Sequence, residues 1–433
     1  MNEQTLDSLC TINPETLGAS TPMDFEFRYL DISAVTKGHI DWSATQLWKF
    51  ANAPSRARRR LRPGDALLCS VRPGLQAHAR IDRDEFIPLV GSTGFVVLRP
   101  NMSTDSGFIF HQLFSNNVAA QLRALETGSS YPAVNESDVR RLRFFTPEPE
   151  ERKRMAVVLD TVDEAIAKTE AVIAKLKQVR AGLLHDLLTR GLDDHGHLRD
   201  PIAHPEQFQG SPLGRIPKEW TFDTLVSLCH RNAGSIQTGP FGSQLHASDY
   251  VEQGVPIITV EHLGDGVIHH VNLPRVCEDD CRRLARYQLR AGDLVFSRVG
   301  AIDRCGLVTQ AEDGWLFSGR CLRVRLGAEG LDPRFFAFQL NGFRCRQWIL
   351  NNAVGSTMHC LNTTILGHLP ITKPPHSEQV LIANRLTLRD SHINQETAVW
   401  LKLGAAKSGL MADLLTGRVR VPEKTIGGTA DDS

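Results

Sequence analysis

Arginine is the residue type that stands out for chemistry in this sequence, because it is concentrated in two separate stretches. Between Lys49 and Arg80 there are eight basic residues and one acid, and between Arg282 and Arg304 there are six arginines and two acids. Such stretches suit an anionic partner such as nucleic acid, whose phosphates and base edges accept hydrogen bonds from arginine. The candidate contacts are Arg56, Arg58, Arg59, Arg60, Arg72, Arg298 and Arg304. The alternative is that both stretches are ordinary solvated faces.

Two kinds of glycine-bounded loop carry polar side chains that suit the same partner. In residues 235–250, two glycines and a proline shape a tight loop that could present side chains to base edges or phosphates. A second loop type, GSSY at 128–131 and GST at 355–357, carries hydroxyls and amides that could bind phosphate. The alternatives are a plain turn for the first type and a capped strand-to-helix connection for the second. The candidate residues are Gln237, Ser243, Gln244, His246, Ser129, Tyr131, Ser356 and Thr357.

Catalytic and metal-binding motifs are missing from the sequence. There is no GxxxxGK[ST], no GxGxxG after a strand, and no Pro-Pro-aromatic tetrapeptide of the kind that amino-methyltransferases use. The nine cysteines are scattered without a CxxC pair, which indicates reduced thiols. Cys277 and Cys281 could share a metal, but no second pair with zinc spacing completes the site. We therefore expect a binding or scaffolding chain with no catalytic residues, no cofactor and no metal of its own.

Composition limits the class of protein. The 433 residues are 41% hydrophobic and 23% charged, which predicts a globular protein of two or three domains. The 49 basic and 49 acidic residues balance, so net charge neither indicates nor excludes a nucleic-acid partner. The sequence has no apolar run long enough to span a membrane and does not begin like a signal peptide, so we expect a cytoplasmic protein.

An internal repeat organises the chain. A shift of 227 places residues 147–189 on residues 374–416 without a gap, and 16 of the 43 positions are identical. The same shift places 128–142 on 355–369, and a shift of 228 places the LRPGD of 61–65 on the LRAGD of 289–293. The chain is therefore two copies of one unit, each a globular domain followed by a long helix.

Apolar residues in steps of three and four predict the two helices. They are Met155, Leu159, Val162, Ile166, Ile173, Leu176, Leu183 and Leu187 in the first copy, and Ile382, Leu386, Ile393, Trp400, Leu403, Leu410 and Leu414 in the second. Polar residues interrupt this seam, among them Arg180 and Lys407. Since a lone helix would leave the seam in water, we expect the two helices to pack together. The paired glycines Gly182 and Gly409 indicate either close helix approach or a local break.

The predicted fold is mixed α/β, with short strands such as 66–71, 94–100, 255–260 and 293–299 and a pseudo-twofold repeat. Candidate helices outside the repeat seam are 107–125 and 333–350. The expected organisation is a first globular domain at 1–146, a helix at 147–192, a linker at 193–216, a second globular domain at 217–373, a helix at 374–417 and a flexible tail at 418–433.

A family resemblance rests on six stretches of the chain. They are GSPLGRIPKEWTFDTLVSL at 210–228, TGPFGS at 238–243, LRAGDLVFSRVGAIDRCGLV at 289–308, GSTMHCLNTTILGHLPITKPPHSEQ at 355–379, and the helix endings LLHDLLTRGL and LMADLLTGRV. The sequence resembles the DNA-specificity subunit of type I restriction-modification systems. The first domain departs from the pattern, because it lacks a clear counterpart of the G-x-x-P-x-x-W start and of the TGPFGS loop.

The resemblance implies a non-catalytic subunit of a DNA methyltransferase and restriction endonuclease. Its two target-recognition domains would read a bipartite double-stranded DNA target, and its helices would pack as an antiparallel coiled coil. Two methyltransferase subunits and the restriction-translocase subunits would assemble on it and would bind S-adenosylmethionine, ATP and Mg. The alternatives from other classes are an adaptor that joins protein partners without reading DNA, and an enzyme with an unfamiliar site in one repeat.

Overall fold

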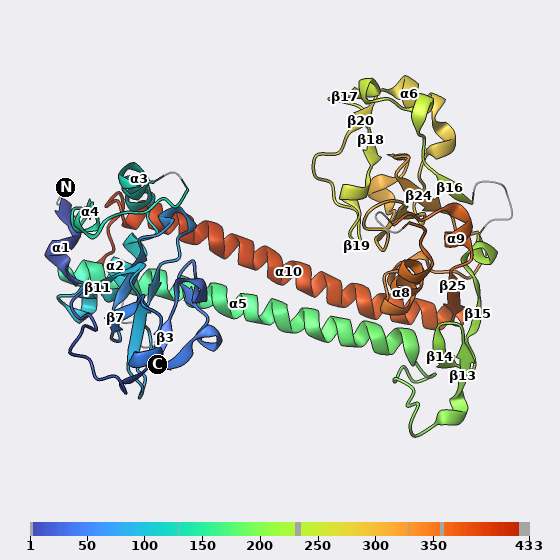
Figure 1. Ribbon diagram of the computed structural model, residues 1–433. Helices are drawn as coiled ribbons and strands as arrows, with labels where there is room; N and C mark the ends of the chain where they lie inside the picture. Colours follow the sequence, from blue (N-terminus) through green and yellow to red (C-terminus); the bar gives the residue numbers. More distant parts are fainter. Residues whose placement is uncertain (1–2, 129, 230–234, 328, 356–358, 424–433) are drawn as a thin grey trace, which may run out of the picture. The chain divides into compact units, whose positions relative to one another are not determined.

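The computed structural model describes residues 3–128, 130–229, 235–327, 329–355 and 359–423. These residues form two compact units, one made of residues 1–172 and 396–433, the other of residues 173–395 (Figure 1). Each unit contains a sheet-rich globular part and a stretch of both long helices. The predicted mixed α/β class with a duplicated architecture is confirmed.

The first unit is built from two sheets under a helical cover. One sheet has the order β2 (Cys10–Ile12), β11 (Phe95–Pro100), β8 (Ala66–Cys69) and β9 (Ala79–Arg80). The other has the order β6 (Gln46–Lys49), β3 (Glu26–Leu30), β10 (Leu89–Ser92) and β7 (Ala57–Leu61). The helices α2 (Ser106–Gln112) and α3 (Asn116–Leu125) follow, and Phe108 and Phe144 are fully buried in a core beside the first sheet.

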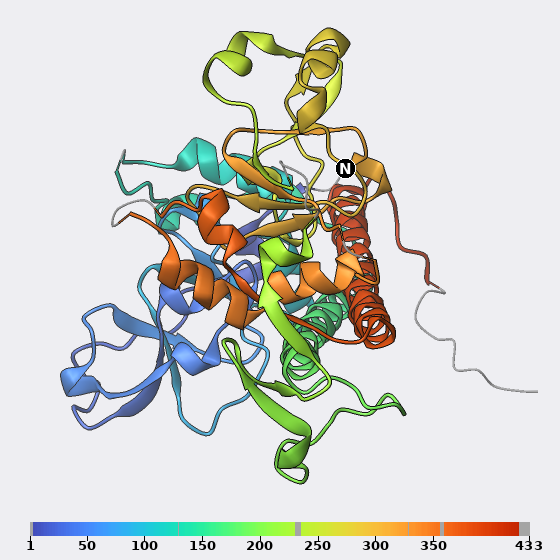
Figure 2. The ribbon, with the colours of Figure 1, turned by 90° about the vertical axis from the view of Figure 1, so that its right-hand side faces the viewer.

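The second unit repeats this plan with a larger sheet (Figure 2). Its main sheet has the order β16 (Ile236–Thr238), β24 (Cys321–Val324), β21 (Leu294–Ser297), β22 (Cys305–Leu307) and β19 (Asp265–Gly266). Its second sheet has the order β17 (Tyr250–Val251), β20 (Arg275–Val276), β18 (Val255–Ile258) and β23 (Leu316–Phe317). The helices α7 (Pro333–Leu340) and α8 (Phe343–Asn352) follow.

Both helical stretches expected outside the repeat seam are split into two helices. The expected 107–125 breaks at Ser115, whose side chain accepts a hydrogen bond from the backbone N–H of Val118 and so begins α3. The expected 333–350 breaks before α8, where Gly342 has extended backbone geometry. The apolar pattern runs through each break, so it does not reveal the break.

The strand that pairs with the last strand before each long helix reveals a further stretch of the repeat. β1 (Glu3–Thr5) pairs with β12 (Arg143–Phe145), as β15 (Thr221–Thr224) pairs with β25 (Pro370–Lys373). The chain continues as TLDSLC at 5–10 and as TLVSLC at 224–229. In each copy the serine hydroxyl donates to the carbonyl of the threonine, at 2.7 Å. Residues 3–10 of the first unit are therefore the counterpart of the residues that follow Trp220 in the second unit. The shift between them is 219 residues instead of 227.

The predicted linker at 193–216 is a packed part of the second unit. It carries the hairpin of β13 (Phe208–Ser211) and β14 (Gly214–Pro217), and Ile216 is fully buried. Buried Glu378 accepts hydrogen bonds from Leu192 N at 2.6 Å, Arg199 Nη1 at 2.8 Å and Trp220 Nε1 at 3.0 Å. These bonds fix the segment, which its composition indicated to be a linker between the two copies.

The beginning of the predicted flexible tail is also fixed. Glu151, the repeat equivalent of Glu378, accepts hydrogen bonds from Arg420 Nε at 2.6 Å and from the backbone N–H of Val421 at 3.3 Å. Val421 is buried in the core of the first unit. The expectation of flexibility is therefore wrong for residues 418–421, while residues 424–433 lie outside the described part of the chain.

The long helices α5 (Pro149–Thr189) and α10 (His376–Leu414) run antiparallel within each unit. In the second unit Arg180 forms a two-pronged ion pair with Asp390, at 2.7 and 3.1 Å. In the first unit Lys407 Nζ lies 2.5 Å from Asp163 Oδ1. The shift of 227 relates the two pairs residue by residue. An aspartate of the facing helix thus neutralises each basic residue that interrupts the seam, and these ion pairs fix the register of the helix pair.

The glycines within and after the helices behave differently from each other. Gly182 and Gly409 lie inside unbroken helices, and a Cβ at either would meet no atom within 4 Å, so neither close approach nor a break explains them. Gly191 follows α5 with φ +62°, and a Cβ there would lie 2.3 Å from the Glu378 carboxylate. Gly191 is therefore required by the buried Glu378 network.

Candidate nucleic-acid interface

The arginines of β7 lie on both faces of an edge strand. Arg58 stacks over Phe50 at 4.9 Å and Arg60 lies over Phe25 at 6.0 Å, measured from the guanidinium carbon to the ring centre. Arg59 points the other way and donates to Thr16 Oγ1 at 3.2 Å. Burial lowers the pKa of the Arg59 guanidinium, because desolvation penalises its charge. The three consecutive arginines therefore do not form one basic patch.

An acidic residue neutralises part of this first basic stretch. Glu15 lies 2.5 Å from Arg62, 2.5 Å from Arg99 and 3.7 Å from Arg60, measured between charged atoms. Arg56 lies just before β7 and is exposed. β7 is the last named strand in its sheet, but residues 15–17 cover its outer edge: Leu17 N donates to the carbonyl of Arg58 at 2.8 Å and Arg60 N to the carbonyl of Glu15 at 3.1 Å. The stretch is thus less positive in the structure than its composition suggests.

Arg72 and Tyr131 come together from two loops of the first unit. The Arg72 guanidinium lies 4.6 Å from the ring centre of Tyr131. The backbone N–H of Arg72 donates to the carbonyl of Pro132 at 2.7 Å. Both side chains are exposed, Tyr131 to 71%. Two sequence-predicted contacts thus form one cationic and aromatic surface. Ser129 lies outside the described residues.

In the second unit the TGPFGS loop interlocks with residues 317–320. A Cβ on Gly239 would lie 2.2 Å from the carbonyl oxygen of Ser318, and a Cβ on Gly319 would lie 2.6 Å from Cβ of Phe241. Arg298 Nη1 lies 3.4 Å from the carbonyl oxygen of Gly319. Close backbone approach therefore explains the glycine at 239 and brings Arg298 to the same loop pair.

This loop pair forms one wall of a cleft of about 570 Å³. Phe241, Tyr250, Glu261 and Arg320 are exposed on it, with Phe241 at 63%. The lining residues are Pro240, Phe241, Leu245, Tyr250, Thr259, Glu261, His262, Asn272, Pro274, Ser318, Gly319 and Arg320. None of these residues is among the contacts predicted from the sequence, although Phe241 lies within the TGPFGS motif. Aromatic faces, a guanidinium and a carboxylate together suit recognition of nucleobases.

The other predicted residues of the second unit play different parts. Gln244 Oε1 accepts a hydrogen bond from Tyr287 Oη at 2.6 Å, so this side chain holds the loop in place. His246 and Arg304 are exposed, and Gln237 lies in β16 opposite Arg323. Ser356, Thr357 and the side chain of Ser243 lie outside the described part of the chain.

The first unit has a segment in the position of the TGPFGS loop. Ile12 pairs with Leu98 in the first sheet as Ile236 pairs with Val324 in the second, so residues 13–18 take the place of residues 237–242. That segment reads NPETLG and contains Glu15 and Thr16, which contact the arginines of β7 and β11. The position is thus shared between units, and its chemistry is not.

Within the described residues, no cluster of three or more His, Cys, Asp and Glu side chains could hold a metal ion. Cys277 instead caps helix α6 (Glu278–Arg283), where its sulfur accepts a hydrogen bond from the backbone N–H of Asp280 at 3.5 Å. In the same described part of the chain, no helix is long and apolar enough to cross a membrane.

Comparisons with known proteins agree with this arrangement. Residues 217–399 match the model of the type I restriction modification DNA specificity domain. The MjaVIII specificity subunit of Methanocaldococcus jannaschii is 23% identical over 337 residues, which are 77% of this chain and 75% of that protein. The EcoBI specificity subunit of Escherichia coli is 23% identical over 290 residues, which are 64% of this chain and 58% of that protein.

Two solved structures share the fold. The type I restriction-modification S subunit from M. genitalium has a TM-score of 0.59 at 14% identity and covers 96% of each chain. A chain from a structure of type I restriction-modification complex assembly has a TM-score of 0.56 at 21% identity, covering 96% of this chain and 98% of that one. The resemblance predicted from the sequence is therefore confirmed: the chain is similar to type I restriction specificity subunits over most of its length, and residues 217–399 match the DNA specificity domain.

Proposed function

We propose that this chain reads a bipartite DNA target and assembles the other subunits of a type I restriction-modification system on it. The observation that carries the proposal is the duplication of one unit, the second copy of which matches the DNA specificity domain. A duplicated reader suits a target made of two half-sites. The adaptor alternative is not favoured, because the relatives are specificity subunits.

Each unit offers a different surface to its half-site. In the first unit the surface is the Arg72 and Tyr131 pair, with Arg56 and the β7 arginines as further candidates. In the second unit it is the cleft beside the TGPFGS loop, with Arg320 and Phe241 exposed on it, Arg298 in contact with the carbonyl of Gly319, and His246 exposed just after the loop. Different surfaces on equivalent scaffolds are what recognition of two unrelated half-sites requires.

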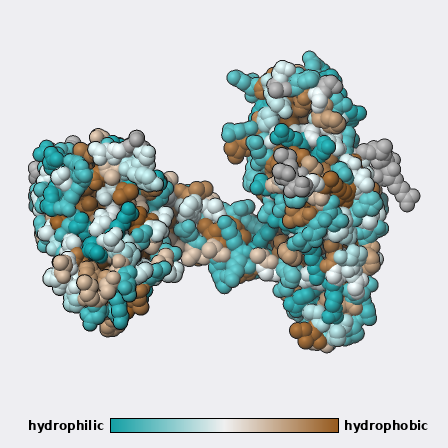
Figure 3. Space-filling view, viewed as in Figure 1, coloured by the Kyte–Doolittle hydropathy of each residue, from teal (hydrophilic) through white to brown (hydrophobic). Residues whose placement is uncertain are grey.

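The long helices provide surface for protein partners. Exposed apolar side chains lie along them, namely Val157, Val172, Val399 and Leu401 in the first unit and Val179, Leu381 and Leu388 in the second. Figure 3 shows such apolar patches among hydrophilic ones on the visible face. Apolar side chains on a polar surface suit protein docking. The partners would be two methyltransferase subunits and the restriction-translocase subunits, which would bind S-adenosylmethionine, ATP and Mg and work in the cytoplasm on the host DNA.

The test is to map methylated adenines in a host that carries this chain with its methyltransferase subunit. We expect a bipartite motif. Arg320→Ala should alter base preference in one half of the motif and Arg72→Ala in the other half. Arg334→Ala is the matched control, because Arg334 is paired with Asp332 and belongs to neither surface, so this variant should leave the motif unchanged. A continuous motif would contradict the proposal, as would a motif that neither Arg320→Ala nor Arg72→Ala alters.

A further inference from the structure

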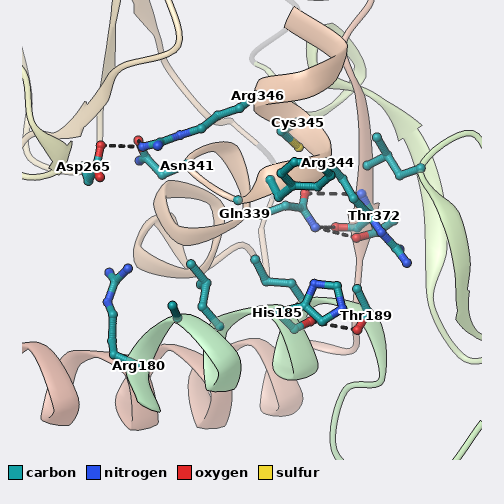
Figure 4. A pocket seen from close by; sticks show the side chains of 16 residues that line it. Arg180, His185, Thr189, Asp265, Gln339, Asn341, Arg344, Cys345, Arg346 and Thr372 are labelled. Atoms are coloured by element: carbon teal, nitrogen blue, oxygen red, sulfur yellow. Dashed lines mark hydrogen bonds and ion pairs between the residues drawn. The ribbon is translucent and has the colours of Figure 1, made fainter. Parts of the chain in front are cut away.

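The two units contain equivalent cavities beside the long helices. In the second unit a cavity of about 240 Å³ lies between α5, the turn that leads into α8 and the β13–β14 hairpin (Figure 4). In the first unit a cavity of about 170 Å³ lies between α10 and the turn that leads into α3. The first-unit lining is Phe114, Ser115, Asn116, Asn117, Ser408, Met411, Ala412 and Thr416. The shift of 227 places every one of these residues on a residue that lines the cavity of the second unit.

The lining chemistry differs between the two cavities. Asn116 and Asn117 of the first unit correspond to Phe343 and Arg344 of the second, and Ala412 corresponds to His185. Phe343 is 73% exposed at the start of α8, and exposed Leu350 lies two turns further along the same face. The position equivalent to Leu350 in α3 is Arg123. At the two positions that begin α8 and α3, the second cavity therefore carries an aromatic ring and a guanidinium where the first carries two uncharged amides.

The cationic groups of the second cavity are not equally engaged. Arg180 is paired with Asp390, and Arg346 with Asp265. Arg344 Nη1 donates to the carbonyl of Arg215 at 3.1 Å, and no carboxylate of the described residues forms an ion pair with it. In Figure 4, Arg180, His185 and Thr189 line the cavity from α5 and Arg344 and Arg346 from the start of α8. A carboxylate supplied from outside would complete the pairing of Arg344.

We propose that the two cavities are equivalent docking sites for one segment on two copies of a protein partner, and that the second unit binds its copy more tightly. The inference rests on the proposed function, in which the partner is the methyltransferase subunit. The docking segment would carry an apolar side chain for the cavity and a neighbouring carboxylate for Arg344. Equivalent cavities account for two copies, and the exchange of two asparagines for phenylalanine and arginine accounts for unequal affinity.

The test exchanges the residues that differ between the cavities. The full chain and the methyltransferase subunit of the same system are titrated, and native mass spectrometry counts the copies bound. We expect two steps for the unaltered chain. Phe343→Asn with Arg344→Asn should weaken the first step about tenfold or more and reduce its salt dependence. Asn116→Phe with Asn117→Arg should strengthen the second step.

Two further variants separate docking from misfolding. Phe343→Asn alone removes an exposed ring and leaves the contact of Arg344 with the hairpin in place. It should still weaken the first binding step. Phe222→Asn makes the same change at an exposed phenylalanine on β15 and should leave both steps unchanged. Unchanged titrations for every cavity variant would overturn the inference, as would loss of DNA affinity with both methyltransferase steps intact. Failure of the unaltered chain to bind any methyltransferase would overturn the proposed function as well.

Discussion

Replacing Glu378 with glutamine should destabilise the second unit far more than the small change in side-chain shape suggests. The Glu378 carboxylate is buried and accepts hydrogen bonds from Leu192, Arg199 and Trp220. Glutamine keeps one oxygen, so the bonds to Leu192 and Arg199 can persist. Its amide nitrogen, however, would face the indole N–H of Trp220, which leaves a buried donor opposite a donor.

The expected magnitude follows from these contacts. An unsatisfied buried donor costs about 1–3 kcal/mol, and loss of the charge weakens the bond from Arg199 by roughly 1 kcal/mol. Arg199 retains Glu219, which lies 2.6 Å away and has a side chain that is 64% exposed. We therefore expect a loss of about 3 kcal/mol, near the lower end for a broken buried ion pair. For a unit of this size that corresponds to a fall in Tm of roughly 6–12 °C.

Differential scanning calorimetry of the full chain would measure this fall. Glu219→Gln is the control, because it removes the exposed carboxylate from the same arginine and should cost less than about 1 kcal/mol. Equal and small effects of Glu378→Gln and Glu219→Gln would refute the reasoning, since the buried network would then contribute nothing beyond a surface ion pair.

Three other outcomes follow from single features. Gly182→Ala and Gly409→Ala should each raise the free energy of unfolding by about 0.5–1 kcal/mol in urea titrations, because each site is open and helical, and a loss would show a contact that the structure lacks. The hydrogen bond from Arg420 lowers the pKa of the Glu151 carboxyl below the ordinary 4.5. The ionised Glu151 therefore stabilises the folded chain above about pH 4.5, and this stabilisation is lost as the pH falls through the lowered pKa of the folded state. Below about pH 4.5 the Tm of the unaltered chain should therefore fall more steeply than the Tm of Glu151→Gln. Arg180→Asp should destabilise the helix pair and Asp390→Arg should restore it, with a coupling of about 1 kcal/mol in a double-mutant cycle; additive losses would show that the pair is unimportant.

The repeat and the helices were predictable because they depend on local pattern. Leu159 and Leu386 of the seam are fully buried in the structure, as their spacing predicts, whereas Trp400 of the same seam is 36% exposed. The polar interruptions at Arg180 and Lys407 could not be interpreted from one helix alone, because their partners lie on the other helix. The repeat shows an aspartate at equivalent positions of the two copies, Asp163 and Asp390. Which residue of the facing helix each aspartate meets depends on the register of the helix pair.

The candidate site was predictable only in outline. Composition located the arginines, but the carboxylate of Glu15 comes from a segment more than 40 residues away in sequence and neutralises part of their charge. The TGPFGS motif was recognised as a loop, whereas Arg320 and Tyr250 reach its cleft from other strands and turns. The match of TLDSLC to TLVSLC was visible in the sequence, and it was missed because an insertion changes the shift between the copies.

The repeat-related ion pairs also bear on how such chains could diversify. Each pair joins a basic residue, Arg180 or Lys407, to an aspartate, Asp390 or Asp163, at equivalent positions of the two helices. A genetic crossover within a helix would therefore exchange whole recognition domains and still place a basic residue opposite an aspartate in the helix pair. Lineages that shuffle domains at these helices would keep a folded scaffold while acquiring new half-site combinations, whereas a crossover inside a sheet would separate strands that pair over long distances.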